Sequence, residues 1–288
     1  MSSVVVRHHM VDIGAGQRVA ADVFLPPAGL ARPIAFCCLS GGGISRRYWD
    51  LRPETYSFAV WASRAGFPVL CVDHIGTGDS PLSDGATAPL LGQVVAANDA
   101  AFRILLDDLP GLRSVGVGHS MGATMTIRQQ AAHDTYDAVA LLGFGTEGLP
   151  TQLSPEILAA CAERMPDDNR LAEWTLKMFG SAYPMLSEDS AKPMDAATTV
   201  LLGSGGLLSM LPGNVADSAA RLRVPVLVLN GARDSLVNGH CARAEQYPQA
   251  ASFTTYVFPG VGHNHNVAPA RRQMWEKLLH WAESVVPS

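Results

Sequence analysis

Apolar residues occur along the chain in two patterns, short continuous runs and longer stretches in which they recur every three or four residues. Short runs bounded by Gly, Pro or Asp are typical of buried strands, and the longer pattern is typical of helices with one apolar face. Strands are predicted near residues 4–13, 18–25, 34–39, 68–72, 114–118, 138–144, 225–230 and 253–258. Helices are predicted near residues 54–65, 93–108, 122–133, 239–246 and 268–285.

The order of these elements predicts an α/β fold in which helices cover both faces of a mostly parallel sheet. A short glycine-containing turn at residues 14–17 joins the first two strands, so we expect them to pair as an antiparallel hairpin at the sheet edge. The remaining strands should run parallel, joined by right-handed crossovers.

Residues 146–222 do not fit this alternation of strands and helices. A structureless loop of that length is uncommon in a compact domain, and prolines divide the segment into short stretches. We therefore expect a core domain formed by residues 1–145 and 223–288, with residues 146–222 forming a helical cap over the strand ends. Half of the chain's ten methionines lie in this cap. They fit ordinary packing and a pliable apolar substrate wall equally well.

Ser120 stands at the centre of the sequence Gly-His-Ser-Met-Gly, residues 118–122. A strand-like run ends just before this sequence and a helical run follows it. A serine on such a sharp strand-to-helix turn has its hydroxyl forced out of the sheet, and the flanking glycines let strand and helix pass closely. Ser120 is therefore a candidate nucleophile. It needs a base, because an alcohol is a weak nucleophile at neutral pH.

Four further segments, in order along nearly the whole chain, resemble loops of the α/β-hydrolase family: residues 39–43, 73–80, 226–234 and 257–263. They stand where the family has its oxyanion loop, its D-x-x-G-x-G-x-S loop, the strand and turn carrying the acid, and the last strand with its histidine. The resemblance implies the α/β-hydrolase fold, an eight-stranded mostly parallel sheet with an inserted helical cap. Ser40 departs from the pattern, because many relatives have a histidine there.

The resemblance implies a catalytic triad of Ser120, Asp234 and His263. His263 would take the proton of the serine hydroxyl, and Asp234 would accept the other imidazole N–H. Two alternatives stay open. His265 is a second candidate base, two residues further on, and Glu147 is a second candidate acid, because some relatives place the acid after the sixth strand.

The same chemistry needs backbone donors for the oxyanion and a surface that contacts the substrate. The N–H of Met121, at the start of a helix, is one expected donor. The second is expected from Gly41 or Gly42, where a missing side chain allows close approach. Candidates for substrate contact in the cap are Trp174, Met178, Phe179 and Met185.

The composition and net charge limit the classes of molecule that the chain is expected to bind. The chain of 288 residues is 48% hydrophobic but only 16% charged, below the usual quarter, and its net charge is −5. The apolar excess suits a covered parallel sheet, an apolar pocket or a homodimer contact. The acidic balance offers no basic surface for nucleic acid or an anionic membrane.

Targeting signals and cysteines indicate the compartment. Residues 1–9 lack the features of a signal peptide, and no apolar run reaches the length of about 18 residues that a membrane span needs. Five cysteines without C-x-x-C spacing are typical of free thiols in a cytoplasmic protein. No metal or cofactor is expected, because the close histidine pairs lack further ligands at metal-binding spacing.

These features together predict a cofactor-free serine hydrolase. It would cleave an ester-like bond, whether carboxylester, thioester or lactone, of a small and fairly apolar substrate through an acyl-enzyme intermediate. A carbon–carbon bond hydrolase of the meta-cleavage type and an acyltransferase use the same triad and remain alternatives. A non-catalytic ligand-binding protein of the same fold is the alternative from another class.

Overall fold

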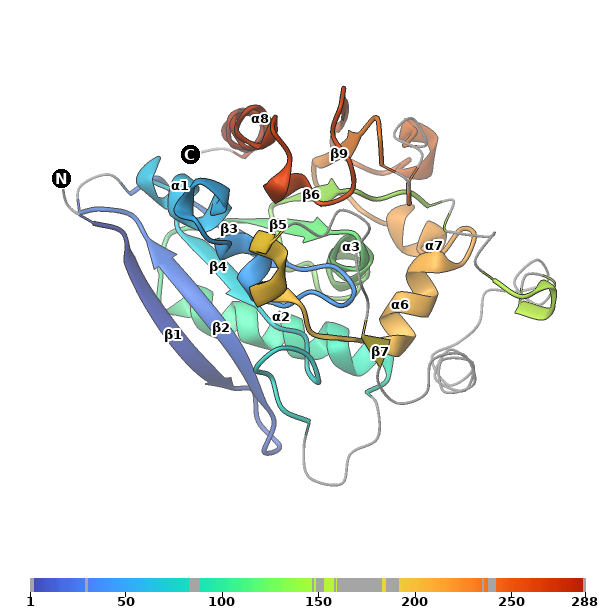
Figure 1. Ribbon diagram of the computed structural model, residues 1–288, viewed down its shortest axis with the longest axis horizontal. Helices are drawn as coiled ribbons and strands as arrows, with labels where there is room; N and C mark the ends of the chain where they lie inside the picture. Colours follow the sequence, from blue (N-terminus) through green and yellow to red (C-terminus); the bar gives the residue numbers. More distant parts are fainter. Residues whose placement is uncertain are drawn as a thin grey trace.

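The eight-stranded sheet organises the molecule (Figure 1). The computed structural model describes residues 3–28, 31–82, 89–146, 148, 153–157, 159, 183–184, 192–234, 236–237 and 242–286. The strands of this sheet are β1 Val5–Asp12, β2 Arg18–Leu25, β3 Ile34–Leu39, β4 Val69–Val72, β5 Arg113–His119, β6 Ala138–Leu142, β9 Val226–Gly231 and β10 Phe253–Phe258.

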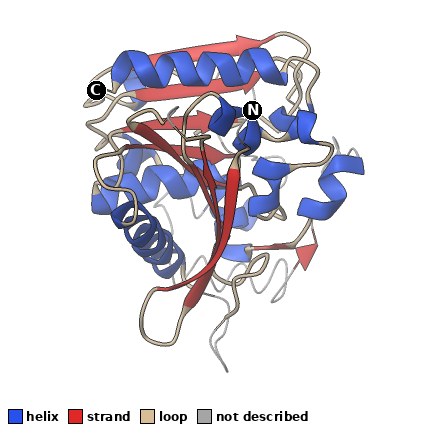
Figure 2. Ribbon diagram, turned by 90° about the vertical axis from the view of Figure 1, so that its left-hand side faces the viewer, coloured by secondary structure: helices blue, strands red, loops and turns tan. Residues whose placement is uncertain are grey.

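The strand order is β1-β2-β4-β3-β5-β6-β9-β10. Strand β2 pairs antiparallel with β1 and with β4, and all later pairs are parallel. The sequence predictions of an edge hairpin and of a mostly parallel sheet are confirmed. The strands change direction strongly from one edge of the sheet to the other, as expected from the right-handed twist of strands (Figure 2).

Helices cover both faces of the sheet. Helices α1 Phe58–Arg64 and α8 Arg271–Val285 lie on one face, and α2 Leu91–Asp107 and α3 Met121–His133 lie on the other (Figure 1). Strand β3 is buried throughout, and its side chains alternate between the two apolar clusters. Its complete burial explains why it reads as a continuous apolar run rather than as an alternating one.

Two predicted helices differ from the structure. Residues 54–65 form a 3-10 turn, Glu54–Tyr56, followed by α1, because the side chain of Ser57 accepts the N–H of Val60 and begins a new helix there. Of residues 239–246, the described part contains only the 3-10 turn Ala244–Gln246. No helix in the described part of the chain is both long and apolar enough to cross a lipid bilayer.

The expected cap is described mainly at its C-terminal end. It contains the 3-10 helix η4 Lys192–Ala197, strand β8 Val200–Leu201, and helices α6 Gly203–Met210 and α7 Ala216–Ala219. Strand β8 pairs with β7 Tyr183–Pro184. Helices α6 and α7 lie beside α3 (Figure 1), and their apolar side chains share its cluster. The boundaries of the cap at residues 146 and 222 stay a prediction.

Candidate active site

Ser120 occupies a strained turn, which we call the elbow, residues 118–122. It follows β5 and caps the N-terminus of α3, with φ 55° and ψ −121°. Residues other than glycine rarely adopt such a backbone conformation. Its N–H donates to the carbonyl oxygen of Leu142 on β6 at 2.8 Å. A Cβ at Gly118 would lie 2.4 Å from the oxygen of Gly122, and one at Gly122 would lie 2.3 Å from the oxygen of Leu39. The glycines on both sides of Ser120 are therefore required by close packing.

Asp234 and His263 are joined by a hydrogen bond. They follow the neighbouring parallel strands β9 and β10, and the Nδ1 of His263 lies 2.8 Å from the Oδ2 of Asp234. The other oxygen of Asp234 accepts the N–H groups of Leu236 at 2.9 Å and Val237 at 3.0 Å. Burial by itself raises the pKa of Asp234, but the hydrogen bonds and the charge of His263 bring it below its usual value. The acid is therefore held ionised beside the imidazole.

The glycine loop, residues 41–45, lies against the elbow. A Cβ at Gly41 would lie 3.1 Å from the Cβ of Ser120, and one at Gly42 would lie 3.7 Å from the Sδ of Met121. Met121 is the first residue of α3, so its N–H has no acceptor within the helix. The structure thus brings together Ser120, Met121 and both glycines that the sequence offered as oxyanion donors.

Ser40 and His74 together support the glycine loop. The hydroxyl of Ser40 donates to the oxygen of Ser45 at 2.9 Å. The oxygen of Ser40 accepts from the Nε2 of His74 at 3.3 Å, and the Nδ1 of His74 accepts from Asn98 at 3.0 Å. Burial lowers the pKa of His74, which favours this neutral arrangement. His74, from the loop after β4, supplies a ring-to-backbone support that sequence reasoning did not anticipate.

His119 links the elbow to the histidine loop. Its Nε2 lies 2.8 Å from the carbonyl oxygen of His263, and its ring stacks on Tyr48 with centroids 4.8 Å apart. Burial, and to a lesser extent the charge of the nearby His263, lowers the pKa of His119 to about 3. His119 is therefore neutral near pH 7, and its Nε2–H donates to the oxygen of His263.

A network of buried ion pairs lies next to the glycine loop. The guanidinium of Arg46, which is 8% exposed, binds Asp22 of β2 at 2.9 Å and also Asp73 and Asp79. Asp73 accepts the backbone N–H groups of Arg46 at 2.6 Å and Asp79 at 2.9 Å. Burial opposes the charge on Arg46, but the carboxylates raise its pKa above the usual value. Asp73 and Asp79 thus stabilise the structure around the loop at residues 73–80.

His265 takes a different position from His263. It is 2% exposed, and its ring packs edge-to-face on His119 with centroids 5.5 Å apart. Neither of its ring nitrogens has a hydrogen-bond partner among the described residues, and burial lowers its pKa well below the usual value. The carboxylate of Asp234 binds His263 instead. The remaining candidates lie outside the described residues: Glu147, Trp174, Met178, Phe179 and Met185.

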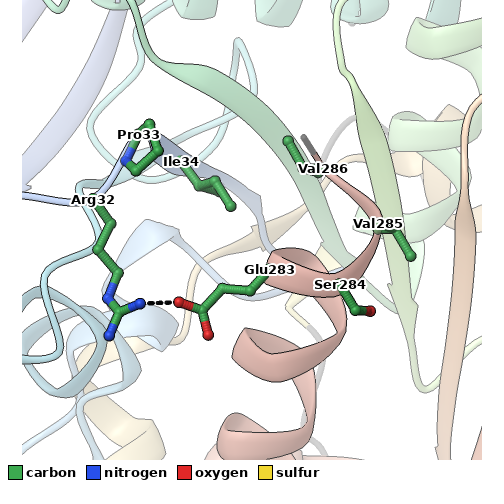
Figure 3. Close-up of a pocket in the computed structure, with 7 residues that line it drawn as sticks. All are labelled: Arg32, Pro33, Ile34, Glu283, Ser284, Val285 and Val286. Atoms are coloured by element: carbon green, nitrogen blue, oxygen red, sulfur yellow. Dashed lines mark hydrogen bonds and ion pairs between the residues drawn. The ribbon is translucent and has the colours of Figure 1, made fainter. Parts of the chain in front are cut away.

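One hollow of about 450 Å³ is lined by residues 32–34 and 283–286 (Figure 3). Arg32 and Glu283 line it and form an ion pair with each other, next to the start of β3 at Ile34. Ile34 pairs with Arg113 at the start of β5, whereas Ser120 follows the end of that strand. The hollow and the candidate active site are therefore at opposite ends of the sheet.

Comparison with known proteins identifies the family. A model of the alpha/beta hydrolase family matches residues 38–272, which include the glycine loop, the elbow, Asp234 and His263. The chain belongs to the alpha/beta hydrolase family. Compared with curated protein sequences, it has no significant match.

Solved structures of alpha/beta hydrolases superpose on the whole chain. A carboxyl esterase from Bacillus coagulans is 17% identical, with 99% of both chains covered and a TM-score of 0.66. A monoglyceride lipase from Saccharomyces cerevisiae is 12% identical, with 100% of this chain and 97% of that chain covered and a TM-score of 0.70. A bromoperoxidase from Bacillus anthracis is 17% identical, with 96% and 100% covered and a TM-score of 0.61. At these identities the likeness shows the fold, and the family with its esterases and lipases supports a hydrolase.

Proposed function

We propose that the chain is a cofactor-independent serine hydrolase that cleaves an ester-like bond through an acyl-enzyme. The observation that carries this proposal is the combination of a strained serine at the elbow with a hydrogen-bonded Asp234–His263 pair on neighbouring strand ends. Backbone strain of this kind is retained where the surrounding structure and the function require it. A non-catalytic ligand-binding protein has no need of an ionised carboxylate hydrogen-bonded to a histidine.

The proton path follows from the ring orientation of His263. Its Nδ1 is bound to Asp234, so Nε2 is the nitrogen that takes the proton from the Oγ of Ser120. The oxygen then attacks the substrate carbonyl carbon. The N–H of Met121 and the N–H of Gly42 or Gly41 bind the resulting oxyanion. Collapse of the intermediate breaks the ester bond, and the proton moves from Nε2 to the leaving alcohol. Water repeats these steps and releases the acid.

The substrate class is argued from the groups around the elbow. Met121 lies beside the glycine loop, and Leu201 covers that loop with an apolar side chain. The described network of charges around Arg46 is engaged with its own carboxylates, so it offers no free cation for an anionic substrate. These features favour a small, fairly apolar carboxylester. The carboxyl esterase and the monoglyceride lipase among the structural neighbours agree with this class.

Covalent labelling tests this proposal whatever the natural substrate is. A fluorophosphonate should label Ser120, because only a base-activated hydroxyl attacks it at neutral pH. Ser120→Ala should abolish labelling and almost all turnover of p-nitrophenyl esters. Ser284→Ala is the matched control, because that serine lies by the distant hollow, and it should label like wild type. Equal labelling of the Ser120→Ala variant would rule out the proposed nucleophile.

The bond type is decided by a substrate panel of esters, thioesters, lactones and β-diketones. Fastest turnover of carboxylesters supports the proposal. Exclusive cleavage of β-diketones would instead place the chain among carbon–carbon bond hydrolases, and transfer to an added alcohol in preference to water would make it an acyltransferase.

A further inference from the structure

The end of the expected cap is bound to the glycine loop. We call residues 197–201 the stem. The N–H of Thr199 donates to the oxygen of Gly43 at 2.9 Å, and the N–H of Ser45 donates to the oxygen of Ala197 at 2.7 Å. The hydroxyl of Ser45 donates to the same oxygen at 3.1 Å. The stem is thus held against the glycine loop by backbone hydrogen bonds in both directions.

The last residue of the stem, Leu201, lies directly on Gly42. A Cβ at Gly42 would be 2.6 Å from the Cδ1 of Leu201, which is closer than real Cβ atoms come to a neighbour. The next atoms near that point belong to Met121, with its Sδ at 3.7 Å and its Cβ at 3.9 Å. Leu201 therefore occupies the space that a side chain at position 42 would take, next to both proposed oxyanion donors.

Helix α6 packs against Leu201 through Gly206. A Cβ at Gly206 would lie 2.8 Å, 3.0 Å and 3.1 Å from the Cδ1, Cδ2 and Cγ of the leucine side chain. Leu201 is only 5% exposed. It is thus enclosed between two positions without side chains, Gly42 on one side and Gly206 on the other. The backbone of the glycine loop and that of α6 therefore pack closely on the leucine side chain.

We propose that Leu201 determines specificity by limiting the size of the acyl group beside the carbonyl carbon. The inference rests on the proposed function. A carbonyl oxygen held between the N–H groups of Met121 and Gly42 brings the substituents of its carbon against the residue that covers Gly42. Because that residue is apolar and fixed, the site takes esters of small, unbranched carboxylic acids and disfavours acyl groups branched next to the carbonyl.

Acyl branching is the variable that tests this role. We would measure kcat/KM for p-nitrophenyl acetate and for p-nitrophenyl 2-methylpropanoate in wild type and Leu201→Ala. A single methylene changes relative kcat/KM by about 10- to 200-fold in an apolar pocket, so the ratio of branched to unbranched ester should rise at least about tenfold in the variant. Leu202→Ala is the matched control. Leu202 is also buried, at 4%, but approaches Gly205 instead, so the ratio should stay at its wild-type value.

Two results separate this inference from the proposed function. If Leu201→Ala turns over the acetate and the ratio is unchanged, Leu201 does not determine specificity, while the serine hydrolase stands. If wild type turns over neither ester and Ser120 is not labelled by a fluorophosphonate, the proposed function itself is wrong.

The contact can also be tested without turnover. Gly42→Ala places a methyl group in the space of Leu201, so it should lower Tm in wild type and lower it much less in the Leu201→Ala background. Gly41→Ala is the comparison, because its Cβ would meet Ser120 and His119 rather than Leu201, and its effect should be the same in both backgrounds. An equal loss of Tm from Gly42→Ala in both backgrounds would overturn the contact on which the inference depends.

Discussion

Ser120 combines an unfavourable backbone conformation with the hydroxyl that we propose as the nucleophile. Its φ of 55° and ψ of −121° are readily adopted only by glycine, and non-glycine residues in such regions cost about 1 to 3 kcal/mol. The N–H bond to Leu142 and the tight packing of Gly118 and Gly122 hold the residue in place. The contacts around the elbow therefore offset the cost of a strained backbone that exposes one hydroxyl group.

Removing this strain should stabilise the protein while abolishing its activity. Ser120→Gly relieves the backbone but adds about 0.5 to 1 kcal/mol of chain entropy in the unfolded state, so we expect a net gain near 1 kcal/mol and a rise in Tm of about 2 °C. Ser120→Ala keeps a Cβ and the strain, and it serves as the matched control. Thermal unfolding of the two variants gives the comparison. A Tm of the glycine variant below that of the alanine variant would mean that the elbow is not strained, because only the entropy cost of glycine would then remain.

The candidate catalytic residues could be proposed from the sequence around Ser120 and from the family resemblance, but the residues that support them could not. Ser120, Asp234 and His263 each follow a recognisable strand and turn. His119 instead supports a carbonyl that is 144 positions away in the chain. No spacing encodes a contact of that range. It depends on the pairing order of β5, β6, β9 and β10, which the structure supplies.

At the scale of elements, His119 joins the end of β5 to the loop after β10. It donates to the oxygen of His263 while its ring stacks on Tyr48. The elbow and the loop that carries His263 are thus joined by a neutral donor, since the pKa of His119 is about 3. A protonated ring there would place a positive charge beside His263.

Loss of this donor should reduce kcat and leave KM nearly unchanged. His119→Phe keeps an aromatic ring against Tyr48 but removes the N–H, and a hydrogen bond of about 1.4 kcal/mol corresponds to about a tenfold lower kcat. His119→Gln retains an N–H donor and should recover part of the loss. Because His119 titrates only near pH 3, the pH profile of the remaining activity between pH 5 and 8 should not move. A larger change in KM than in kcat would indicate a role in substrate binding instead.

Element types followed from the hydrophobic pattern more reliably than their ends. All eight sheet strands lie within two residues of their predicted ranges. The signal is strongest for β3, β4, β6 and β9, because strands buried along their whole length appear as continuous apolar runs. The helix predicted for residues 54–65 is interrupted because the side chain of Ser57 accepts the N–H of Val60 and so begins α1. Periodicity does not detect such a cap inside a stretch whose residues all suit a helix.

At the scale of the whole molecule, the buried cation Arg46 joins three separate segments of the chain. Arg46 binds Asp22 of the edge hairpin, Asp73 after β4, and Asp79, and it stands just beyond the glycine loop. The side chain of Asp73 is completely buried, and it accepts two backbone N–H groups in addition to the guanidinium. The edge hairpin, the loop after β4 and the glycine loop therefore meet at a single charge network.

Neutralising Asp73 should weaken the whole fold rather than one loop. Removing one partner of a buried ion pair leaves an uncompensated charge and typically costs about 3 to 5 kcal/mol. Since Asp22 and Asp79 still face Arg46, we expect Asp73→Asn to lower the free energy of unfolding by about 3 kcal/mol and Tm by about 6 to 12 °C. Glu54→Gln removes an ion pair between two exposed side chains, Glu54 and Arg64, and should change stability by less than about 1 kcal/mol. Chemical denaturation of both variants provides the measurement. Equal losses from the two substitutions would show that the network around Arg46 contributes no more than a surface pair.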